Sequence, residues 1–333
     1  MADPITDKLF HDAIFGEEQR RIVLCTTLRD FDEDVPEGEK MSENCQMQEL
    51  FLRCVARQTY QNFRLVVTTF SERNDRTVRK AVDAIFDDPA QREKVILIRE
   101  DLEGDYRFSM TSVLLNGIEE ARKGYEPVVV WCGGDIVLQG NLFEALDKIY
   151  SDDLAGTSHP SLMTLSMKYF RQQAVGFPPP TTTFDMMFFA AKLLQDEEVL
   201  NIIKKYRFYD RGLFSAFLAG LALRSKNRVN LINISDAVKI LNKRDKSIEP
   251  PEYLRACQRR NFEVLKRFVT ETGADENILK ACTEHTTWLH DLFGVIKPGP
   301  PQIPPRMTFK DVKDDLSVAI GTDNTGEAES DAQ

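Results

Sequence analysis

The chain has 333 residues, 42% of them hydrophobic, and a formal net charge of −10. This length and composition predict one large globular domain or two smaller ones with a sizeable core. The acidic balance argues against a protein that coats nucleic acid. No apolar run reaches the roughly 18 residues of a membrane-spanning helix, so we expect no membrane span.

The first residues and the cysteines indicate the compartment. The segment MADPITDKLFHDAIFG contains acidic residues and lacks the apolar stretch of a secretory signal. Six cysteines are scattered without a CxxC pair, a pattern that favours reduced thiols over disulfides or a zinc site. We therefore expect a cytoplasmic protein.

Strands and helices alternate in the first half. Short apolar runs predict strands at 20–30, 63–72, 94–100 and 127–131. Apolar residues at helical spacing predict helices at 47–55, at 75–86 with Asp75 as N-cap, at 109–124 ending at Gly124, and at 141–150. This alternation is typical of βαβ units and a mostly parallel sheet.

The second half is less regular. The proline-rich segment 176–183 predicts a loop, order restarts at 184–195, and 209–225 predicts a helix. A strand at 228–235, a polar loop at 240–252 and a long amphipathic helix at 252–273 follow. Residues 298–305 form a proline-rich linker, and we expect the last ~14 residues to be disordered. The predicted parts are an N-terminal segment 1–20, a first half 21–150, a second half 151–296, and a linker with an acidic tail 297–333.

In parallel sheets, ligands bind at the carboxyl ends of the strands. Polar residues and glycines lie at or after the ends of all four predicted strands of the first half, and we expect them to line one crevice. The candidates are Thr26, Thr27, Arg29, Thr69, Glu72, Arg107, Gly133, Gly134 and Asp135.

Three stretches carry a resemblance to a known family. LRCVARQTYQNFRLVVTTFSE (52–72) resembles the first crossover of nucleotide-sugar-dependent glycosyltransferases of the GT-A fold, family-2-like. LLNGIEEARKGYEPVVVWCGGDIVL (114–138) resembles the helix and strand that lead to their DxD-type motif. FDMMFFAAKLL, followed by YDRGLFSAFLAG, is similar to their acceptor-side segment.

The resemblance implies a GT-A-like, Rossmann-like α/β fold: a mostly parallel sheet flanked by helices, with a helical C-terminal extension. It also implies a nucleoside-diphosphate sugar donor and often a divalent cation, Mn²⁺ or Mg²⁺. The family's second strand ends in paired aspartates that hold the donor's base and ribose. Here Thr69 and Phe70 stand at those positions, and Ser71 or Glu72 are the possible substitutes.

Asp135 is the candidate for the donor diphosphate. The family's metal motif has two or three acids, whereas here Cys132, Gly133 and Gly134 precede a single Asp135. A cation held by this carboxylate would neutralise charge that develops on the leaving diphosphate, and the glycines would let a phosphate or sugar approach the backbone. The alternative is a strand-to-helix turn without a ligand.

Basic side chains are a second way to neutralise the diphosphate. Lys243 and Arg244 follow a predicted strand, in a region that often folds over the diphosphate in the family. The alternative for them is a solvated charged loop. Arg107 would contact phosphate or pair with Asp105. Thr26 and Thr27 would meet the nucleobase, or simply favour a strand.

An inverting enzyme needs a base that takes the proton of the attacking hydroxyl. Asp185 and Asp210 are the candidates, and for Asp210 an N-cap is the alternative role. The acceptor would be a glycan, a small molecule or a protein.

Three functions remain possible at this stage. The first is a glycosyltransferase that moves a sugar from a nucleoside-diphosphate sugar to a hydroxyl acceptor. The second is an inactive GT-A-like binding or scaffold protein, in which the proline-rich linker and acidic tail recruit a protein partner. The third, a dehydrogenase or methyltransferase, is disfavoured because CTTLRDFDED lacks a glycine-rich fingerprint.

Overall fold

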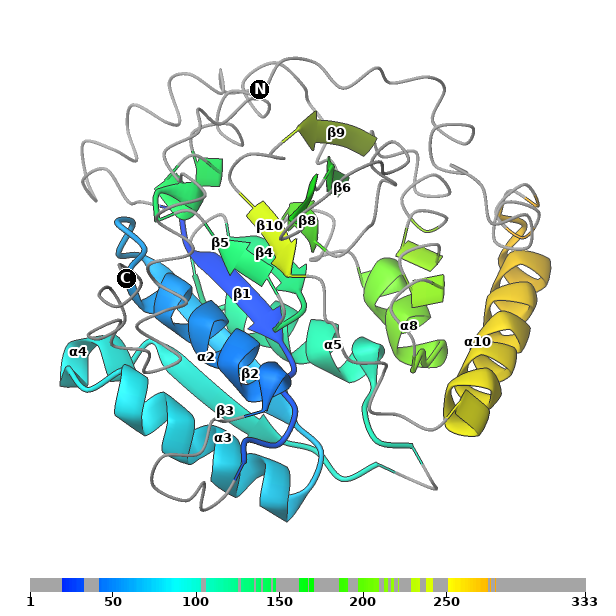
Figure 1. The fold of residues 1–333 in the computed structure, drawn as a ribbon. Helices are drawn as coiled ribbons and strands as arrows, with labels where there is room; N and C mark the ends of the chain where they lie inside the picture. Colours follow the sequence, from blue (N-terminus) through cyan, green and yellow to red (C-terminus); the bar gives the residue numbers. More distant parts are fainter. Residues whose placement is uncertain are drawn as a thin grey trace, which may run out of the picture.

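The structure is a computed structural model (Figure 1). The residues that it describes are 20–32, 42–102, 106–124, 127–134, 136–138, 140–144, 146–147, 162–166, 168–170, 186–190, 197–209, 213–214, 217–218, 221, 229–233, 238–241, 251–274, 276 and 279. Among the helices of these residues, none is both long and apolar enough to cross a membrane.

A seven-stranded sheet forms the centre of the fold. Its order is β3 (Val95–Arg99), β2 (Phe63–Thr69), β1 (Ile22–Thr26), β4 (Val128–Cys132), β8 (Met186–Ala190), β6 (Leu162–Ser166) and β9 (Val229–Asn233). Only β8 runs antiparallel to its neighbours β4 and β6, and the other pairs are parallel. The sheet therefore takes strands from both predicted halves of the chain.

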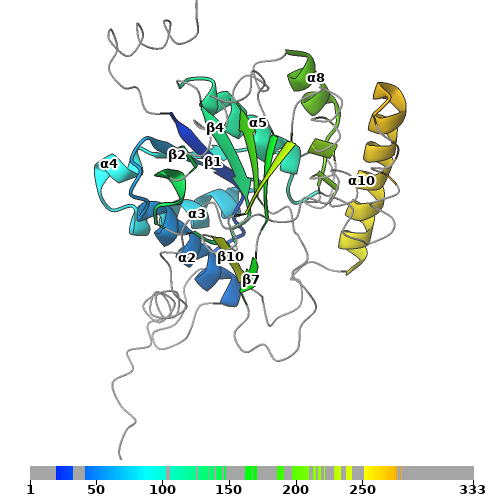
Figure 2. The same cartoon turned by 90° about the horizontal axis from the view of Figure 1, so that it is seen from above.

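Helices cover both faces of this sheet (Figures 1 and 2). Helices α2 (Glu43–Ala56) and α3 (Glu72–Ile85) lie on one face, and α5 (Met110–Ala121) and α8 (Glu197–Lys205) lie on the other. Helix α10 (Pro251–Thr272) lies outside α8, and the short α4 (Pro89–Arg92) precedes β3. The expected architecture is confirmed: a mostly parallel α/β sheet flanked by helices, with a helical C-terminal extension.

A second, three-stranded sheet lies beside the main one. Strand β10 (Val238–Leu241) pairs antiparallel with β5 (Ile136–Leu138) and parallel with β7 (Lys168–Phe170). Strand β5 follows β4 closely in the sequence, so the chain passes from the main sheet to the second sheet between Cys132 and Ile136. The predicted polar loop 240–252 is wrong at its start, because Ile240 and Leu241 belong to β10.

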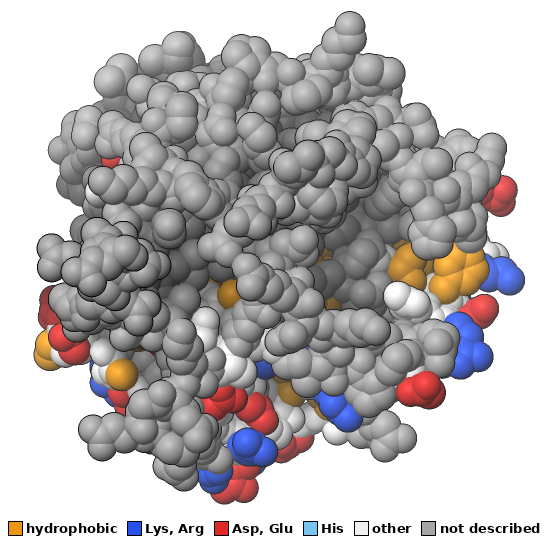
Figure 3. All heavy atoms as spheres, viewed as in Figure 1, with side chains coloured by type: hydrophobic (Ala, Val, Ile, Leu, Met, Phe, Trp, Pro, Cys, Tyr) orange, Lys and Arg blue, Asp and Glu red, His pale blue; other side chains and the backbone are white. Residues whose placement is uncertain are grey.

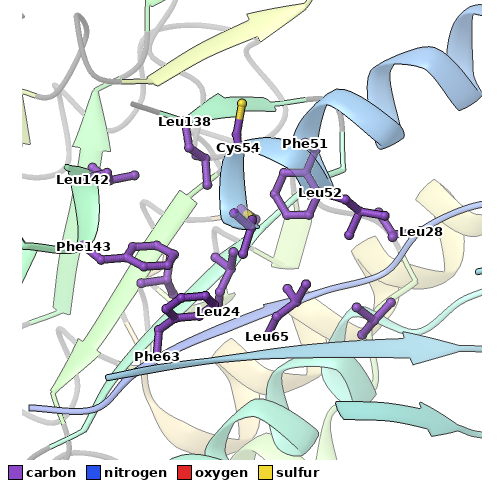
Figure 4. Close-up of a cluster of buried hydrophobic side chains, with 14 of the residues drawn as sticks. Leu24, Leu28, Phe51, Leu52, Cys54, Phe63, Leu65, Leu138, Leu142 and Phe143 are labelled. Carbon is purple, nitrogen blue, oxygen red and sulfur yellow. The ribbon is translucent and has the colours of Figure 1, made fainter. Parts of the chain in front are cut away.

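The core has two layers because successive side chains of a strand point to opposite faces. Every residue of β1 is buried. Ile22 and Leu24 pack toward α2 and α3, in the cluster drawn in Figure 4 with Phe51, Phe63 and Phe143. Val23 and Cys25 pack toward α5, α8 and α10. A strand buried on both faces explains the unbroken apolar run that predicted it.

Helix α5 approaches β1 unusually closely at Gly117. A Cβ at this position would lie 2.6 Å from Cys25 Cβ and 2.7 Å from Cys25 Sγ. Glycine is therefore required here by helix–strand packing, not by a turn. This contact fixes α5 against the centre of the sheet.

Two predicted helix boundaries are wrong. Helix α3 begins at Glu72, and its N-cap is Ser71, whose side chain accepts a hydrogen bond from Asn74 N–H, so Asp75 lies inside the first turn. Helix α5 ends at Ala121 with Arg122 as C-cap, before Gly124. The wrong N-cap was predicted for α3 because Ser71, Asn74 and Asp75 all follow β2 closely, and all three residue types are common N-caps.

Candidate functional site

The carboxyl ends of β1, β2, β3 and β4 meet at one edge of the main sheet. The parallel register pairs Thr26 with Val67, Thr69 with Arg99, and Cys25 with Trp131. This edge, called the carboxyl edge below, is where α/β sheets of this kind bind ligands. Of the candidates, Thr26, Thr69 and Gly133 lie at or directly after the ends of these strands, along this edge.

Two buried amides hold the segment after β1. Gln48 of α2 accepts a hydrogen bond from Arg29 N–H at 2.5 Å and donates one to Arg29 O at 3.3 Å. Asn74 of α3 donates to Leu28 O at 3.0 Å and accepts from Phe70 N–H at 3.3 Å. The backbone after β1 is thus fixed to both helices through Leu28 O and through the N–H and C=O of Arg29.

Thr26 and Thr27 differ in exposure. Thr26 is fully buried, and its hydroxyl donates to Cys132 O at 2.8 Å, which joins the ends of β1 and β4. Thr27 is partly exposed. Of the two predicted nucleobase contacts, Thr27 is the one whose surface a ligand can reach without rearrangement.

The end of β2 carries hydroxyls where the family has aspartates. Thr69 is buried, and its hydroxyl donates to Asp75 Oδ1 at 3.2 Å. Ser71 is used as the N-cap of α3. Glu72 is exposed in the first turn of that helix. Of the two possible substitutes, Glu72 is therefore the one with an exposed carboxylate that is not used to cap α3.

The end of β4 is closed by the protein itself. Cys132, Gly133 and Gly134 are buried. A Cβ at Gly134 would collide with the side chain of Leu28 and lie 3.5 Å from Gln48 Cγ. The space beside this glycine, expected for a phosphate or sugar, is filled by the segment after β1. A larger residue at this position would have to displace the terminal methyl group of Leu28.

These three residues do not fit a divalent cation, because the Cys132 thiol lies in the apolar core and the glycines have no side chain. No group of three or more His, Cys, Asp or Glu residues that could hold a metal occurs within the described part of the chain. Asp135, the predicted metal ligand, lies outside that part, as do Lys243, Arg244, Asp185 and Asp210.

Arg107 is held against α10. Its N–H donates to Tyr253 Oη at 2.8 Å, and its guanidinium lies 5.1 Å from the centre of the Tyr253 ring. The preceding Tyr106 stacks on Tyr209 with ring centres 3.6 Å apart. The segment before α5 is thereby attached to the C-terminal half, and the predicted role of Arg107 at phosphate stays a prediction.

A carboxylate near the site is stabilised in its charged form. Asp32 accepts a hydrogen bond from Ser42 N–H at 2.6 Å, and this bond is the main reason why the pKa of Asp32 is lowered. Asp32 N–H in turn lies 3.2 Å from Cys45 Sγ.

Charged side chains of both signs are mixed along the surface near α3, at the lower margin of Figure 3.

Sequence reasoning did not single out the residues that organise the edge, which are Gln48, Asn74, Asn116 and Glu100. Asn116 of α5 donates to Thr68 Oγ1 at 3.1 Å and to Glu100 Oε1 at 2.8 Å. A signal was present for Gln48, which falls on the apolar face of its predicted helix with Phe51 and Val55. A polar residue on such a face is informative because burial requires a partner.

Comparison with known proteins adds fold-level likeness only. The chain matches no protein-family model, and no curated protein is significantly similar to it in sequence. One similar solved structure is a 4-diphosphocytidyl-2C-methyl-D-erythritol synthase, with 15% identity, a TM-score of 0.35, and coverage of 73% of this chain and 100% of that one. A second is a CMP:2-keto-3-deoxy-manno-octonic acid synthetase in complex with CTP, with 10% identity, a TM-score of 0.37, and coverage of 74% and 99%.

The glycosyltransferase GlyE of Streptococcus pneumoniae TIGR4 is also similar. It shows 9% identity and a TM-score of 0.36, with coverage of 77% of this chain and 64% of that one. Likeness at this level does not identify a reaction or a substrate, because one fold hosts many functions. The functional argument therefore depends on the site itself.

Proposed function

We propose that the chain is a glycosyltransferase that binds a nucleoside-diphosphate sugar at the carboxyl edge and transfers the sugar to a hydroxyl acceptor. The observation that carries the proposal is that buried amides fix the backbone at this edge while a few polar side chains there stay accessible. Buried amides of Gln48, Asn74 and Asn116 fix the ends of β1, β2 and β3, and Thr27 and Glu100 stay partly exposed there. Fixed backbone with a few accessible polar groups is typical of a preformed ligand site.

The chemistry assigned to individual residues follows the resemblance. In the proposal, Asp135 lies at the donor diphosphate, with or without a divalent cation. Lys243 and Arg244 would neutralise the leaving group from the other side. Asp185 or Asp210 would accept the proton of the attacking hydroxyl.

A donor panel tests the proposal. Purified protein is incubated with UDP-, GDP- and dTDP-sugars, with Mn²⁺, with Mg²⁺ or with a chelator, and released nucleoside diphosphate is measured. Asp135→Ala is compared with Glu119→Ala, a matched loss of an exposed acid on α5. We expect release from one donor class, lost in Asp135→Ala and kept in Glu119→Ala.

Two results would go against parts of this proposal. Release that survives Asp135→Ala would remove this carboxylate from the mechanism. No release and no rise of the melting temperature with any donor would refute donor binding altogether.

A second candidate function, donor binding without turnover, is favoured by a specific observation. The family's acids are replaced by Thr69 and Phe70 after β2, and by Cys132, Gly133 and Gly134 after β4. A binding or scaffold protein of this kind would be stabilised by one class of nucleotide sugar but would release no nucleoside diphosphate in the same assay.

A further inference from the structure

Glu100 is the first residue after β3, and its position places it on a defined face of the carboxyl edge. The register pairs Thr69 with Arg99, and Glu100 N–H donates to Thr69 O at 2.9 Å, so Phe70 and Glu100 follow as neighbours one step further. Side chains alternate along strands. Phe70 and Glu100 therefore share the face covered by α5, whereas Thr69 points to the opposite face, toward Asp75.

The carboxylate of Glu100 is held by one oxygen. Asn116 is buried on α5, and its Nδ2 donates to both Thr68 Oγ1 and Glu100 Oε1. An amide nitrogen has two hydrogens, so both are used. Oε2 accepts no hydrogen bond, and Glu100 forms no ion pair, with any residue in the described ranges.

This arrangement is unusual for a merely structural side chain. Glu100 is only partly exposed, and a partly buried charge without a cation is unfavourable unless hydrogen bonds satisfy it. Asn116 satisfies one oxygen and orients the other. Phe70, the neighbour of Glu100 across β2 and β3, is also partly exposed, and it packs against the core under α5. An aromatic face next to a fixed acceptor suits a flat heterocycle with an N–H on its edge.

We infer that Glu100 is a specificity-determining residue, which accepts a hydrogen bond from the ring N–H of a nucleobase that stacks on Phe70. This inference rests on the proposed function, since it concerns the base of the same nucleotide. A carboxylate acceptor favours uracil, whose N3 carries a hydrogen, and guanine, whose N1 does. It disfavours cytosine and adenine, whose corresponding ring nitrogens are acceptors, because two acceptors would face each other.

The substitution Glu100→Gln tests the inference through the polarity of one hydrogen bond. Asn116 Nδ2 donates to the oxygen of the side chain, so the glutamine oxygen stays on Asn116 and its NH₂ takes the place of Oε2. The open position then donates instead of accepting. Asp101→Asn is the matched control, since it removes a charge from the adjacent residue, whose side chain is 87% exposed.

The readout is the dissociation constant of UDP, GDP, CDP and ADP, measured by calorimetry under one metal condition. We expect the wild type to prefer UDP and GDP over CDP and ADP by about tenfold or more, the effect of one hydrogen bond of roughly 1.4 kcal/mol. Glu100→Gln should reverse the order of UDP and CDP, and Asp101→Asn should leave it unchanged. Phe70→Leu should weaken all four nucleotides together without changing their order.

The two proposals fail in different ways. If the wild type binds none of the nucleotides, the proposed function is refuted and this inference with it. If the wild type binds them with an order that Glu100→Gln leaves unchanged, or that Asp101→Asn changes equally, nucleotide binding stands and the role of Glu100 is refuted.

Discussion

Replacing Gly117 by alanine tests the close contact between α5 and β1. In an ordinary helix interior this change would stabilise the protein by about 1 kcal/mol, because alanine is the better helix former. Here the new Cβ would lie 2.6 Å from Cys25 Cβ, whereas ordinary van der Waals contact begins at 3.4 Å. A Cβ on a buried central strand cannot rotate away, so helix and sheet must separate locally.

Overpacking of this kind costs about 1–3 kcal/mol, and the upper part of that range applies because the contact is with backbone-fixed atoms. After the gain in helix propensity, we expect Gly117→Ala to lower the free energy of unfolding by about 1–2 kcal/mol. Urea unfolding followed by circular dichroism measures this change, and an unchanged m-value would show that the same surface is exposed.

A double-mutant cycle with Cys25→Gly provides the control. Cys25→Gly removes both clashing atoms and is destabilising by itself, because it leaves a cavity. If the contact is as close as described, the double variant should be more stable than the sum of the single effects by about 1 kcal/mol or more. A Gly117→Ala protein as stable as the wild type, or additive effects, would refute the reasoning.

Three further predictions concern charge and burial. The pKa of Asp32 is lowered in the folded state, so its carboxylate stabilises the fold at pH values above the unfolded pKa. This stabilisation is lost as the pH falls through the folded pKa. The difference in unfolding free energy between the wild type and Asp32→Asn should therefore shrink below about pH 4. Glu120 is buried, and its carboxylate lies 2.7–4.0 Å from the basic groups of Arg21, Arg64 and Lys123. Glu120→Gln should therefore lower the free energy of unfolding in urea titrations by about 1–2 kcal/mol, and by less in high salt. An effect that salt leaves unchanged would contradict this. Iodoacetamide should alkylate the described cysteines only after unfolding, because all of them are buried and burial raises the pKa of the Cys25 thiol. Mass spectrometry detects the label. Fast labelling of the native protein would contradict the packing at the described cysteines, which are Cys25, Cys45, Cys54, Cys132 and Cys257.

The strands of the first half were predictable because their physical signal is local. Runs such as IVLCT and VVVWC are buried on both faces, so every residue is apolar or a β-former. The strand order was not predictable in the same way. Strand β8 lies between β4 and β6 and runs antiparallel to both, and this pairing joins segments that are far apart in the sequence.

The candidate site was predicted in outline only. The strand ends pointed to Thr26, Thr69 and Gly134 as candidates. In the structure, the hydroxyls of Thr26 and Thr69 form internal hydrogen bonds, and Leu28 packs against Gly134. The residues that fix the edge lie on helices, where a buried amide and a solvated amide look alike in sequence. Glu100 could not be singled out, because its orientation depends on Asn116 across a strand-to-helix contact.

Amide hydrogen exchange with and without a nucleoside-diphosphate sugar tests the central claim most directly, because it locates the bound donor on the chain. We expect slower exchange at the ends of β1, β2 and β3, in residues 27–30, 70–72 and 100–102, when the donor is added. Protection confined to the opposite edge of the sheet, around residues 20–22 and 62–64, or no protection at saturating donor, would contradict the account.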